Sequence, residues 1–275
     1  MNYRDNLFDV SGKVVVITGG SGVLGSALAC DLAERGARLA LLSRNPAPEK
    51  KIEERLIRSE GDYTLLACDV LDRESVKSAL RETLNHYGRV DVLINGAGGN
   101  DPRATTSAEK SFFDIPAQAF NNVLELNLTG TVIPSQVFGA YFAQSGRGVI
   151  LNISSMNAFR PLTRIPAYSA AKAALSNFTQ WLAVHMAQEY SPKIRVNAIA
   201  PGFFLTRQNR FLLVDKESGK PTPRGLAILQ HTPAGRYGAP EDLAGAVTWL
   251  ISDASCFVTG TVVAVDGGFS AFSGV

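Results

Sequence analysis

The residues with the clearest chemical potential are a tyrosine and a lysine four positions apart, Tyr168 and Lys172 in the stretch YSAAK. On a helix, this spacing places both side chains on one face. A free phenol has a pKa near ~10 and is almost inert as an acid or base at neutral pH. A neighbouring ammonium favours the phenolate, so we expect Lys172 to lower the pKa of Tyr168 toward the pH at which a proton donor works. An isolated pair of this kind is more often one face of an amphipathic helix, so further motifs must decide.

A glycine-rich turn lies between the first apolar run and the first helical pattern, in VVVITGGSGVLGSALA. Gly20, Gly22 and Gly25 fit G-x-G-x-x-G, in which small residues let the backbone approach a pyrophosphate at a helix N-terminus. The alternative is that the glycines are needed only for packing. The position of the motif inside a first βαβ unit argues against this alternative. We therefore expect a bound dinucleotide.

The residues after the second apolar run bear on which dinucleotide binds. Many dinucleotide folds carry an acid about 20 residues beyond the loop, where it binds the adenosine ribose. This chain has Ser43 and Arg44 at that place. A small residue followed by a guanidinium leaves room and charge for a 2′-phosphate, which favours NADP(H). The alternative is that Arg44 is a solvated loop residue and that NAD(H) also binds.

Seven apolar runs recur along the chain, and none of them alternates cleanly between apolar and polar residues. Continuous apolar strands are typical of a parallel sheet that is covered on both faces. Because helical patterns lie between the runs, we expect an α/β fold, a doubly wound Rossmann-type three-layer sandwich with a seven-stranded, mainly parallel sheet. Its ligand site would lie at the carboxyl ends of the strands, and residues 1–275 would form one domain. The expected strands are 14–18, 38–43, 64–70, 90–95, 149–154, 194–200 and 261–266.

Composition argues against several other classes of protein. The 275 residues carry a formal net charge of +2 and no basic cluster interleaved with aromatic residues, so we expect no nucleic-acid partner. The longest uncharged run, 126–146, is interrupted by Asn127 and Pro134, which favours a buried helix over a membrane span. The N-terminus lacks an apolar signal region, and three widely spaced cysteines indicate reduced thiols, so we expect a cytoplasmic protein. The three histidines are scattered, and we expect no metal site.

Five motifs together carry a family resemblance. The glycine loop, NGAG at 95–98, NISS, YSAAK and PGFFLT occur in the order and spacing typical of the single-domain short-chain dehydrogenase/reductase family, and the resemblance spans nearly the whole chain. There are two departures: the middle loop glycine is Gly22, where the family usually places it at Val23, and Gly96 replaces the second asparagine of NNAG. The resemblance implies hydride transfer between a nicotinamide and a carbonyl or alcohol carbon.

The resemblance also implies roles for individual residues. Tyr168 would protonate the developing alkoxide, aided by the charges of Lys172 and of the oxidised nicotinamide, and Ser155 would donate a hydrogen bond to the same oxygen. Ser155, and not Ser154, keeps the thirteen-residue offset to Tyr168. Asn127 would hold a water in a proton relay. The implied cofactor contacts are Gly19, Ser21, Gly22, Val23, Leu24, Gly25, Ser43, Arg44, Asp69, Val70, Asn95, Ala97, Gly98, Tyr168, Lys172, Pro201, Gly202 and Thr206.

Two long segments at the same sheet edge should decide the substrate. Residues 100–117 are an insertion, and the cation-rich segment 207–236 falls where the family places a mobile lid, about 203–236. With Arg160 and Arg164 near Ser155, these segments suit a small, polyhydroxylated, anionic substrate. Strings such as NISSMNAF and NAIAPGFFLTRQNR resemble the D-mannonate oxidoreductase (fructuronate reductase) branch, which handles a keto sugar acid. On this resemblance the substrate would contact Ser155, Tyr168, Asn157, and Arg207 or Arg210.

Other functions stay open. The close alternative is a gluconate 5-dehydrogenase-like or other polyol dehydrogenase, and 3-oxoacyl thioester reduction is disfavoured by the polar lid. A non-catalytic NADP-binding sensor could lose Tyr168, Lys172 or Ser155 without cost, yet all three are present. The apolar stretches 126–146 and 173–186 carry more apolar residues than solvated helices need, so we expect a homodimer or homotetramer.

Overall fold

The computed structural model describes residues 6–47, 50–59, 61–206 and 210–274. Its sheet has seven strands in the order β3-β2-β1-β4-β5-β6-β7, and every neighbouring pair is parallel. The predicted fold class is confirmed, with a sheet that is wholly parallel within the described residues. The third strand ends earlier than expected, since the chain turns after Ala67. The strands are β1 (Val14–Thr18), β2 (Arg38–Ser43), β3 (Tyr63–Ala67), β4 (Val92–Asn95), β5 (Gly148–Ile153), β6 (Ile194–Pro201) and β7 (Val262–Val265).

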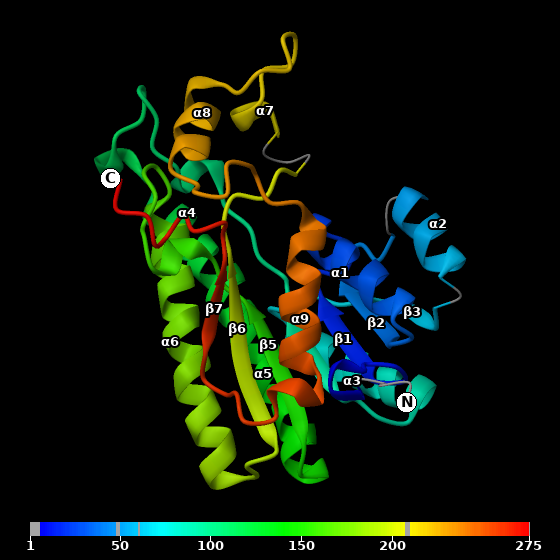
Figure 1. Ribbon diagram of the computed structural model, residues 1–275. Coiled ribbons are helices and arrows are strands. Elements are labelled where there is room, and N and C mark those ends of the chain that lie inside the picture. The colour runs from blue at the N-terminus through cyan, green and yellow to red at the C-terminus, as the bar shows by residue number, and fades with distance from the viewer. Residues whose placement is uncertain (1–5, 48–49, 60, 207–209, 275) are drawn as a thin grey trace.

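Helices cover both faces of this sheet, as Figure 1 shows. Alternate strand residues serve the two sides: Val15 belongs to one buried apolar cluster and its neighbour Val16 to the other. The first cluster lies beneath α1 (Val23–Glu34), α2 (Lys50–Arg58) and α9 (Ala244–Ile251). The second lies beneath α3 (Arg73–Tyr87), α5 (Gly130–Ser145) and α6 (Pro166–Glu189). The strands are apolar throughout because both of their faces are buried.

The remaining helices gather at the carboxyl edge of the sheet. Short helices α7 (Arg210–Leu213) and α8 (Pro223–Gln230) rise above this edge in Figure 1. Beside them lie α4 (Ala117–Leu124) and a π-helical turn, η4 (Glu125–Thr129), which leads directly into α5. Among the described residues, no helix combines the length and apolar character needed to cross a bilayer.

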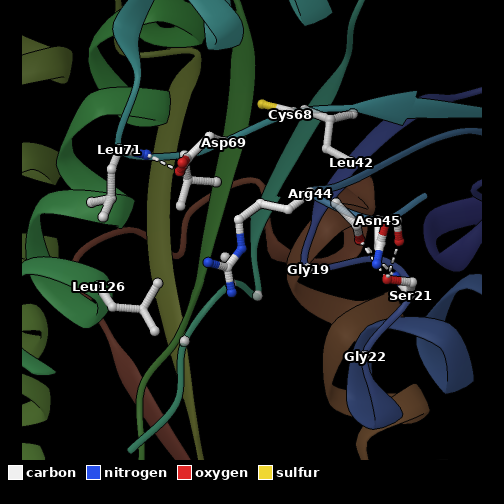
Figure 2. A pocket seen from close by; sticks show the side chains of 15 residues that line it. Gly19, Ser21, Gly22, Leu42, Arg44, Asn45, Cys68, Asp69, Leu71 and Leu126 are labelled. Carbon is white, nitrogen blue, oxygen red and sulfur yellow. Dashed lines mark hydrogen bonds between the residues drawn. The ribbon is translucent and has the colours of Figure 1, made fainter. Parts of the chain in front are cut away.

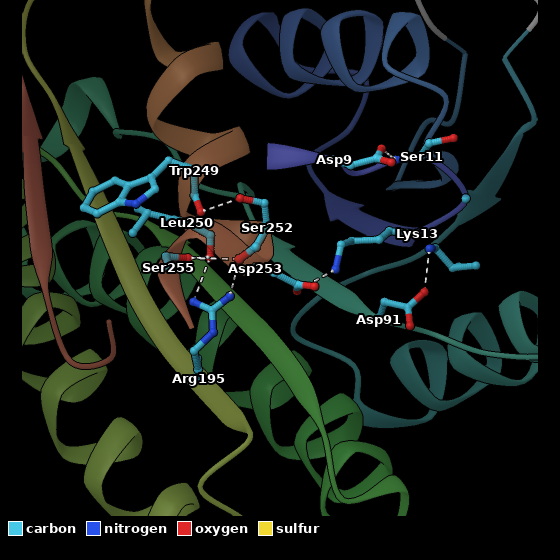
Figure 3. Close-up of polar contacts among 12 residues, drawn as sticks. Asp9, Ser11, Lys13, Asp91, Arg195, Trp249, Leu250, Ser252, Asp253 and Ser255 are labelled. Carbon is cyan, nitrogen blue, oxygen red and sulfur yellow. Dashed lines mark hydrogen bonds and ion pairs between the residues drawn. The ribbon is translucent and has the colours of Figure 1, made fainter. Parts of the chain in front are cut away.

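A buried arginine braces the opposite, amino edge of the sheet. Arg195 on β6 is 7% exposed, and its guanidinium donates to the carbonyls of Leu250 at 2.9 Å and Ser252 at 3.0 Å, where α9 ends (Figure 3). A third, longer bond of 3.4 Å reaches the carbonyl of Val258. The last carbonyls of a helix have no intrahelical partner and carry partial negative charge. A cation there donates hydrogen bonds to these carbonyls and also balances their charge. Arg195 thus fixes α9 to the sheet, far from the carboxyl edge.

Candidate active site

The carboxyl edge of the sheet holds a continuous cleft made of two adjoining cavities. A cavity of about 550 Å³ lies beside the ends of β2 and β3, and one of about 330 Å³ lies beside the ends of β5 and β6. Gly19, Gly22, Gly96 and Gly98 line both cavities and so form the boundary between them. The glycine turn lines both cavities, Ser43 and Arg44 line the first, and Tyr168 and Lys172 line the second.

The glycine turn has the shape that a pyrophosphate requires. Gly19 is in the left-handed region with φ +69°, and a Cβ on Gly25 would lie 2.3 Å from the Gly19 carbonyl oxygen. Gly22 is the N-cap of α1 and supplies no side-chain cap, so the first N–H groups of α1, at Val23 and Leu24, remain available to an anion. The turn fits a dinucleotide, although Gly20, chosen from the sequence motif, packs beneath it against Leu41.

Four residues at the adenosine end form a polar rim (Figure 2). Ser43 Oγ accepts from the backbone N–H of Ser21 at 3.0 Å and from its hydroxyl at 2.8 Å, while Ser21 Oγ also reaches the carbonyl of Asn45 at 3.2 Å. The exposed guanidinium of Arg44 extends into the cavity, and no described residue gives it an acidic partner. Asp69 and Val70 line the far wall of the same cavity. The rim therefore offers hydroxyls and a free cation to a ligand.

The turn after β4 explains one departure from the family pattern. Thr18 Oγ1 accepts from the N–H groups of Gly96 and Ala97 at 3.1 and 3.2 Å, which draws this turn against β1. A Cβ on Gly96 would lie 2.8 Å from the carbonyl oxygen of Thr18, so this path leaves no room for an asparagine side chain. Ala97 and Gly98 line the cleft as expected.

Asn95 was expected to form part of the cofactor wall, but it lies below the cleft. It is 2% exposed, and its Nδ2 donates to Ser135 Oγ at 3.0 Å and to Asn152 Oδ1 at 2.9 Å. Asn152 continues this buried network to Thr179 on α6 at 2.8 Å. The side chain points into the protein because β4 is covered on both faces. Asn95 thus links the sheet to α5.

The four residues expected to be catalytic meet in the second cavity. Asn127, Ser155, Tyr168 and Lys172 all line it, together with Pro201, Gly202 and Thr206. Tyr168 and Ser155 line this cavity together, and the Ser155 hydroxyl is close enough to lower the pKa of the phenol. Lys172 Nζ lies 5.5 Å from the centre of the Tyr168 ring and donates to the carbonyl of Ile153 at 2.8 Å. The residues come from β5, η4 and α6, which converge at this edge.

The expected lowering of the Tyr168 pKa by Lys172 is not found. Burial raises the pKa of Tyr168, and the hydrogen bond from Ser155 opposes this rise. Burial also lowers the pKa of Lys172 to about 8. The cost of removing water from the charged form is the largest influence on the pKa of each group. The protein's own groups therefore keep Tyr168 protonated, in the form of an acid.

Asn127 occupies the π-helical turn between α4 and α5. Its Nδ2 donates to the carbonyls of Gly99 at 2.6 Å and Val123 at 2.8 Å, and its Oδ1 accepts from the Gly99 N–H at 3.2 Å. The side-chain amide is thus fully engaged with the main chain. A π turn is frequent at functional sites because it displaces main-chain groups from their regular partners. Any water held by Asn127 would bind its main-chain carbonyl.

Several residues that were expected to contact the substrate are not found among the described residues that line the cleft. Arg207 lies outside the described residues. Arg210 is exposed on α7 and is not among the described residues that line either cavity. Asn157 is 5% exposed and lies behind Ser155, so it faces the protein interior instead of a substrate. It occupies the short turn η5 (Met156–Ala158), whose tight path carries its side chain under Ser155.

One cation that the sequence did not single out is Arg224, at the start of α8. It is partly buried, and burial lowers its pKa, as does the positive charge of Arg164. Arg164 precedes α6 and is the only described residue other than glycine with a positive φ, +76°. The positive charges of Arg164 and Arg224 therefore act on each other, and no acid among the described residues acts on Arg224. Glu109 interacts electrostatically with Arg164. Only the folded chain brings residues 164 and 224 together, so spacing along the sequence could not reveal the pair.

A parallel Rossmann-type sheet, a glycine turn at a helix N-terminus and a Ser-Tyr-Lys cluster in one cleft define an NAD(P)-dependent oxidoreductase that acts on alcohol and keto groups. A family model described as Enoyl-(Acyl carrier protein) reductase matches residues 21–270. The chain belongs to the short-chain dehydrogenase/reductase family.

Three similar proteins locate the chain within this family. It is 47% identical to the uncharacterized oxidoreductase UxuB of Bacillus subtilis, over 97% of this chain and 98% of that one. A solved structure from Haemophilus influenzae, provisionally assigned as a D-mannonate oxidoreductase with bound NAD, shares 46% identity with a TM-score of 0.90, covering 97% and 98% of the two chains. One from Agrobacterium tumefaciens, provisionally assigned as a 2-deoxy-D-gluconate 3-dehydrogenase with bound NADP, shares 30% identity with a TM-score of 0.83, covering 98% and 100%.

Proposed function

We propose that this protein is an NADPH-dependent reductase of a small, polyhydroxylated keto acid, with fructuronate to D-mannonate as the first candidate reaction. The observation that carries the proposal is the position of Tyr168, which lines one cavity together with Ser155, Lys172 and the glycine turn. The provisional assignment of the Haemophilus influenzae protein agrees with this substrate class. The close alternative is a dehydrogenase of a related gluconate or polyol, in line with the Agrobacterium tumefaciens protein.

The side chains of the second cavity would divide the chemistry between them. When bound, the reduced cofactor supplies the hydride to the carbonyl carbon. Tyr168 Oη then donates its proton to the oxygen that gains negative charge, and Ser155 Oγ donates a hydrogen bond to the same oxygen. The ammonium of Lys172 would hold the nicotinamide ribose and lower the cost of the phenolate that remains. Lys172, Asn127 and Gly98 lie together, since a Cβ on Gly98 would be 2.8 Å from Asn127 Oδ1 and 3.6 Å from Lys172 Nζ.

The cofactor preference rests on the rim of the first cavity. Arg44 presents a guanidinium that has no acidic partner among the described residues, and it lies beside Ser21 and Ser43, which suits the 2′-phosphate of NADP(H). No aspartate or glutamate occupies position 43, where a carboxylate would repel that phosphate. NAD(H) remains the alternative, because the similar Haemophilus influenzae structure holds NAD.

The anionic group of the substrate would meet Arg164 and Arg224. Two guanidiniums that repel each other are stabilised by an anion between them, and a carboxylate matches their planar donors. The acyl chain and the thioester group of a 3-oxoacyl thioester are uncharged, so neither group would gain from such a pair. We therefore assign the carboxylate of the keto acid to the end of the cleft beneath α8.

We further propose that two copies associate through α5 and α6. An apolar groove of about 470 Å³ runs between these helices, and Trp181, beside it, is 58% exposed. Val184 and Tyr190 on the same surface are 57% and 55% exposed. A contiguous exposed apolar surface of this kind is typical of an interface between subunits.

The proposed reaction is tested by following loss of reduced-nicotinamide absorbance with NADPH and a panel of ketose acids that begins with fructuronate, and with fructose as a neutral comparison. We expect turnover of at least one acid and little of fructose. Tyr168→Phe removes only the acidic hydroxyl, so turnover should fall by at least about 100-fold, while NADPH binding stays close to that of the wild type. Turnover by Tyr168→Phe within tenfold of the wild type would refute the acid role. Turnover confined to neutral ketoses would refute the substrate class alone.

A further inference from the structure

Asn157 makes a set of hydrogen bonds that reaches the proposed catalytic serine. The side chain is 5% exposed and forms hydrogen bonds with three other residues. Its Oδ1 accepts from the N–H of Leu162 at 3.0 Å and from Ser169 Oγ at 3.3 Å. Its Nδ2 donates to Ser155 Oγ at 3.3 Å, and its backbone N–H donates to the same oxygen at 3.2 Å.

The direction of the Asn157 amide is fixed by chemistry. The two ends of an asparagine amide are usually assigned from their partners. Here one partner is the backbone N–H of Leu162, which can only donate, so the end that faces it must be the oxygen. The nitrogen therefore faces Ser155. The amide cannot reverse without setting two N–H donors against each other.

This arrangement restricts the Ser155 O–H bond to one direction. A serine hydroxyl has one donor and two acceptor positions. Two N–H groups of Asn157 occupy the acceptor side, so the hydrogen must turn toward Tyr168 and the second cavity. We propose that Asn157 is a positioning residue that makes Ser155 a hydrogen-bond donor to the reacting oxygen. This inference rests on the catalytic role proposed for Ser155.

Asn157 also connects the serine to the helix that carries the tyrosine. Ser169 follows Tyr168 directly on α6, and its hydroxyl reaches Asn157 Oδ1. One buried amide therefore contacts both the end of β5 and the first turns of α6. Because the amide is nearly inaccessible to water, no solvent molecule readily replaces its donors.

Asn157→Asp is the sharpest test, since it keeps the shape and replaces the N–H donor with an acceptor. The Ser155 hydroxyl would then donate to the new carboxylate and be lost to the substrate. Loss of one such donor typically costs about 100-fold or more in kcat, and we expect a loss of that order with KM and NADPH affinity little changed. Asn157→Ala removes the donor without adding a competing acceptor, so its kcat should fall less, on the order of tenfold. A merely structural residue would give the opposite order, because alanine leaves the larger cavity.

Ser169→Ala is the matched control. It removes a hydrogen bond to the same buried amide but leaves both donors to Ser155 in place, so its kcat should stay within about twofold of the wild type. A second readout needs no substrate: an ultraviolet titration, with Tyr168→Phe as the reference, reports the pKa of Tyr168. Asn157→Asp should raise this pKa further, because Ser155 no longer donates to the phenolate.

The outcomes separate this inference from the proposed function. If Ser155→Ala keeps its turnover, the catalytic role of Ser155 is wrong, whatever Asn157 does. If Ser155→Ala is inactive but Asn157→Asp keeps the kcat and the Tyr168 pKa of the wild type, the positioning role is overturned. Should Asn157→Asp fail to fold, Asn157→Ala decides alone, and an unchanged kcat in that variant would overturn the inference.

Discussion

The ammonium of Lys172 donates a 2.8 Å hydrogen bond to the main-chain carbonyl of Ile153, the last residue of β5. Ile153 lies two residues before Ser155, so this bond joins α6 to the strand end that carries the serine. The lysine is 4% exposed, and its charge is opposed by burial without a carboxylate to balance it. The position of the cation is therefore set by a neutral carbonyl, which leaves its charge sensitive to pH.

The pH dependence of reduction follows from this lysine. Burial lowers its pKa from 10.5 to about 8, so the ammonium is present below that pH and is lost as pH rises through it. Burial raises the pKa of Tyr168, so the phenol keeps its proton over the same range. We expect kcat/KM for reduction to be nearly flat below about pH 8 and to fall above it, as measured by NADPH oxidation across buffers of constant ionic strength. A profile that stays level to pH 10 would contradict the role of the charged lysine.

The cofactor preference can be reversed at one exposed residue. Arg44→Asp replaces the cation at the rim with a carboxylate that repels a 2′-phosphate and can bind ribose hydroxyls. The ratio of kcat/KM for NADPH to that for NADH should fall by about 100-fold or more, a change of about 3 kcal/mol in relative binding. Arg81→Asp on α3 is a control for the change in net charge, since Arg81 does not line the cavity. An unchanged ratio in Arg44→Asp would show that Arg44 does not recognise the phosphate.

Subunit association can be tested at Trp181. Its ring stacks on Phe178 at 6.3 Å and on His185 at 4.8 Å, which holds a flat apolar surface open to solvent. Trp181→Glu places a charge in that surface, so the assembly should shift to a smaller species in sedimentation or light scattering. Phe113→Glu is the comparison, because Phe113 is 92% exposed on the loop before α4 and lies outside the α5 and α6 groove. An assembly that is equally reduced by both variants would argue against the α5 and α6 interface.

The sequence predicted the sheet and the common face of Tyr168 and Lys172 because both depend on local signals. A buried parallel strand must be apolar along its whole length, and the Tyr168 and Lys172 spacing is fixed by one helix. Asn95 and Asn157 were misplaced because the family resemblance assigned these positions to the cleft, whereas both side chains are buried within hydrogen-bond networks. Such networks depend on which strands and turns become neighbours. For the same reason, the sequence did not predict that Arg164 acts on Arg224 or that Arg195 contacts the end of α9.

Arg195 lies far from the cleft, and we predict that its replacement lowers the stability of the fold. Arg195→Met keeps much of the volume but removes the guanidinium donors from the carbonyls of Leu250 and Ser252. The Ser255 hydroxyl also reaches both carbonyls, but its single hydrogen can serve only one of them at a time. Burial already lowers the pKa of this arginine, so its charge gains little by itself, and the loss comes from the charge-assisted hydrogen bonds that these carbonyls no longer receive. We expect the free energy of unfolding, measured by urea denaturation, to fall by about 3 kcal/mol. NADPH affinity should be unchanged, because Figure 3 places Arg195 with the end of α9 at the amino edge of the sheet.

The control for this prediction is Arg35→Met on the surface. Arg35 contacts Asp31 at 2.8 Å in an exposed pair four residues apart, and such pairs contribute about 0.5 kcal/mol or less. The two variants remove the same charge and introduce the same side chain, so their difference measures the value of the buried carbonyl contacts. Equal losses in the two variants would show that the bonds between Arg195 and the end of α9 contribute no more to stability than a solvated ion pair does.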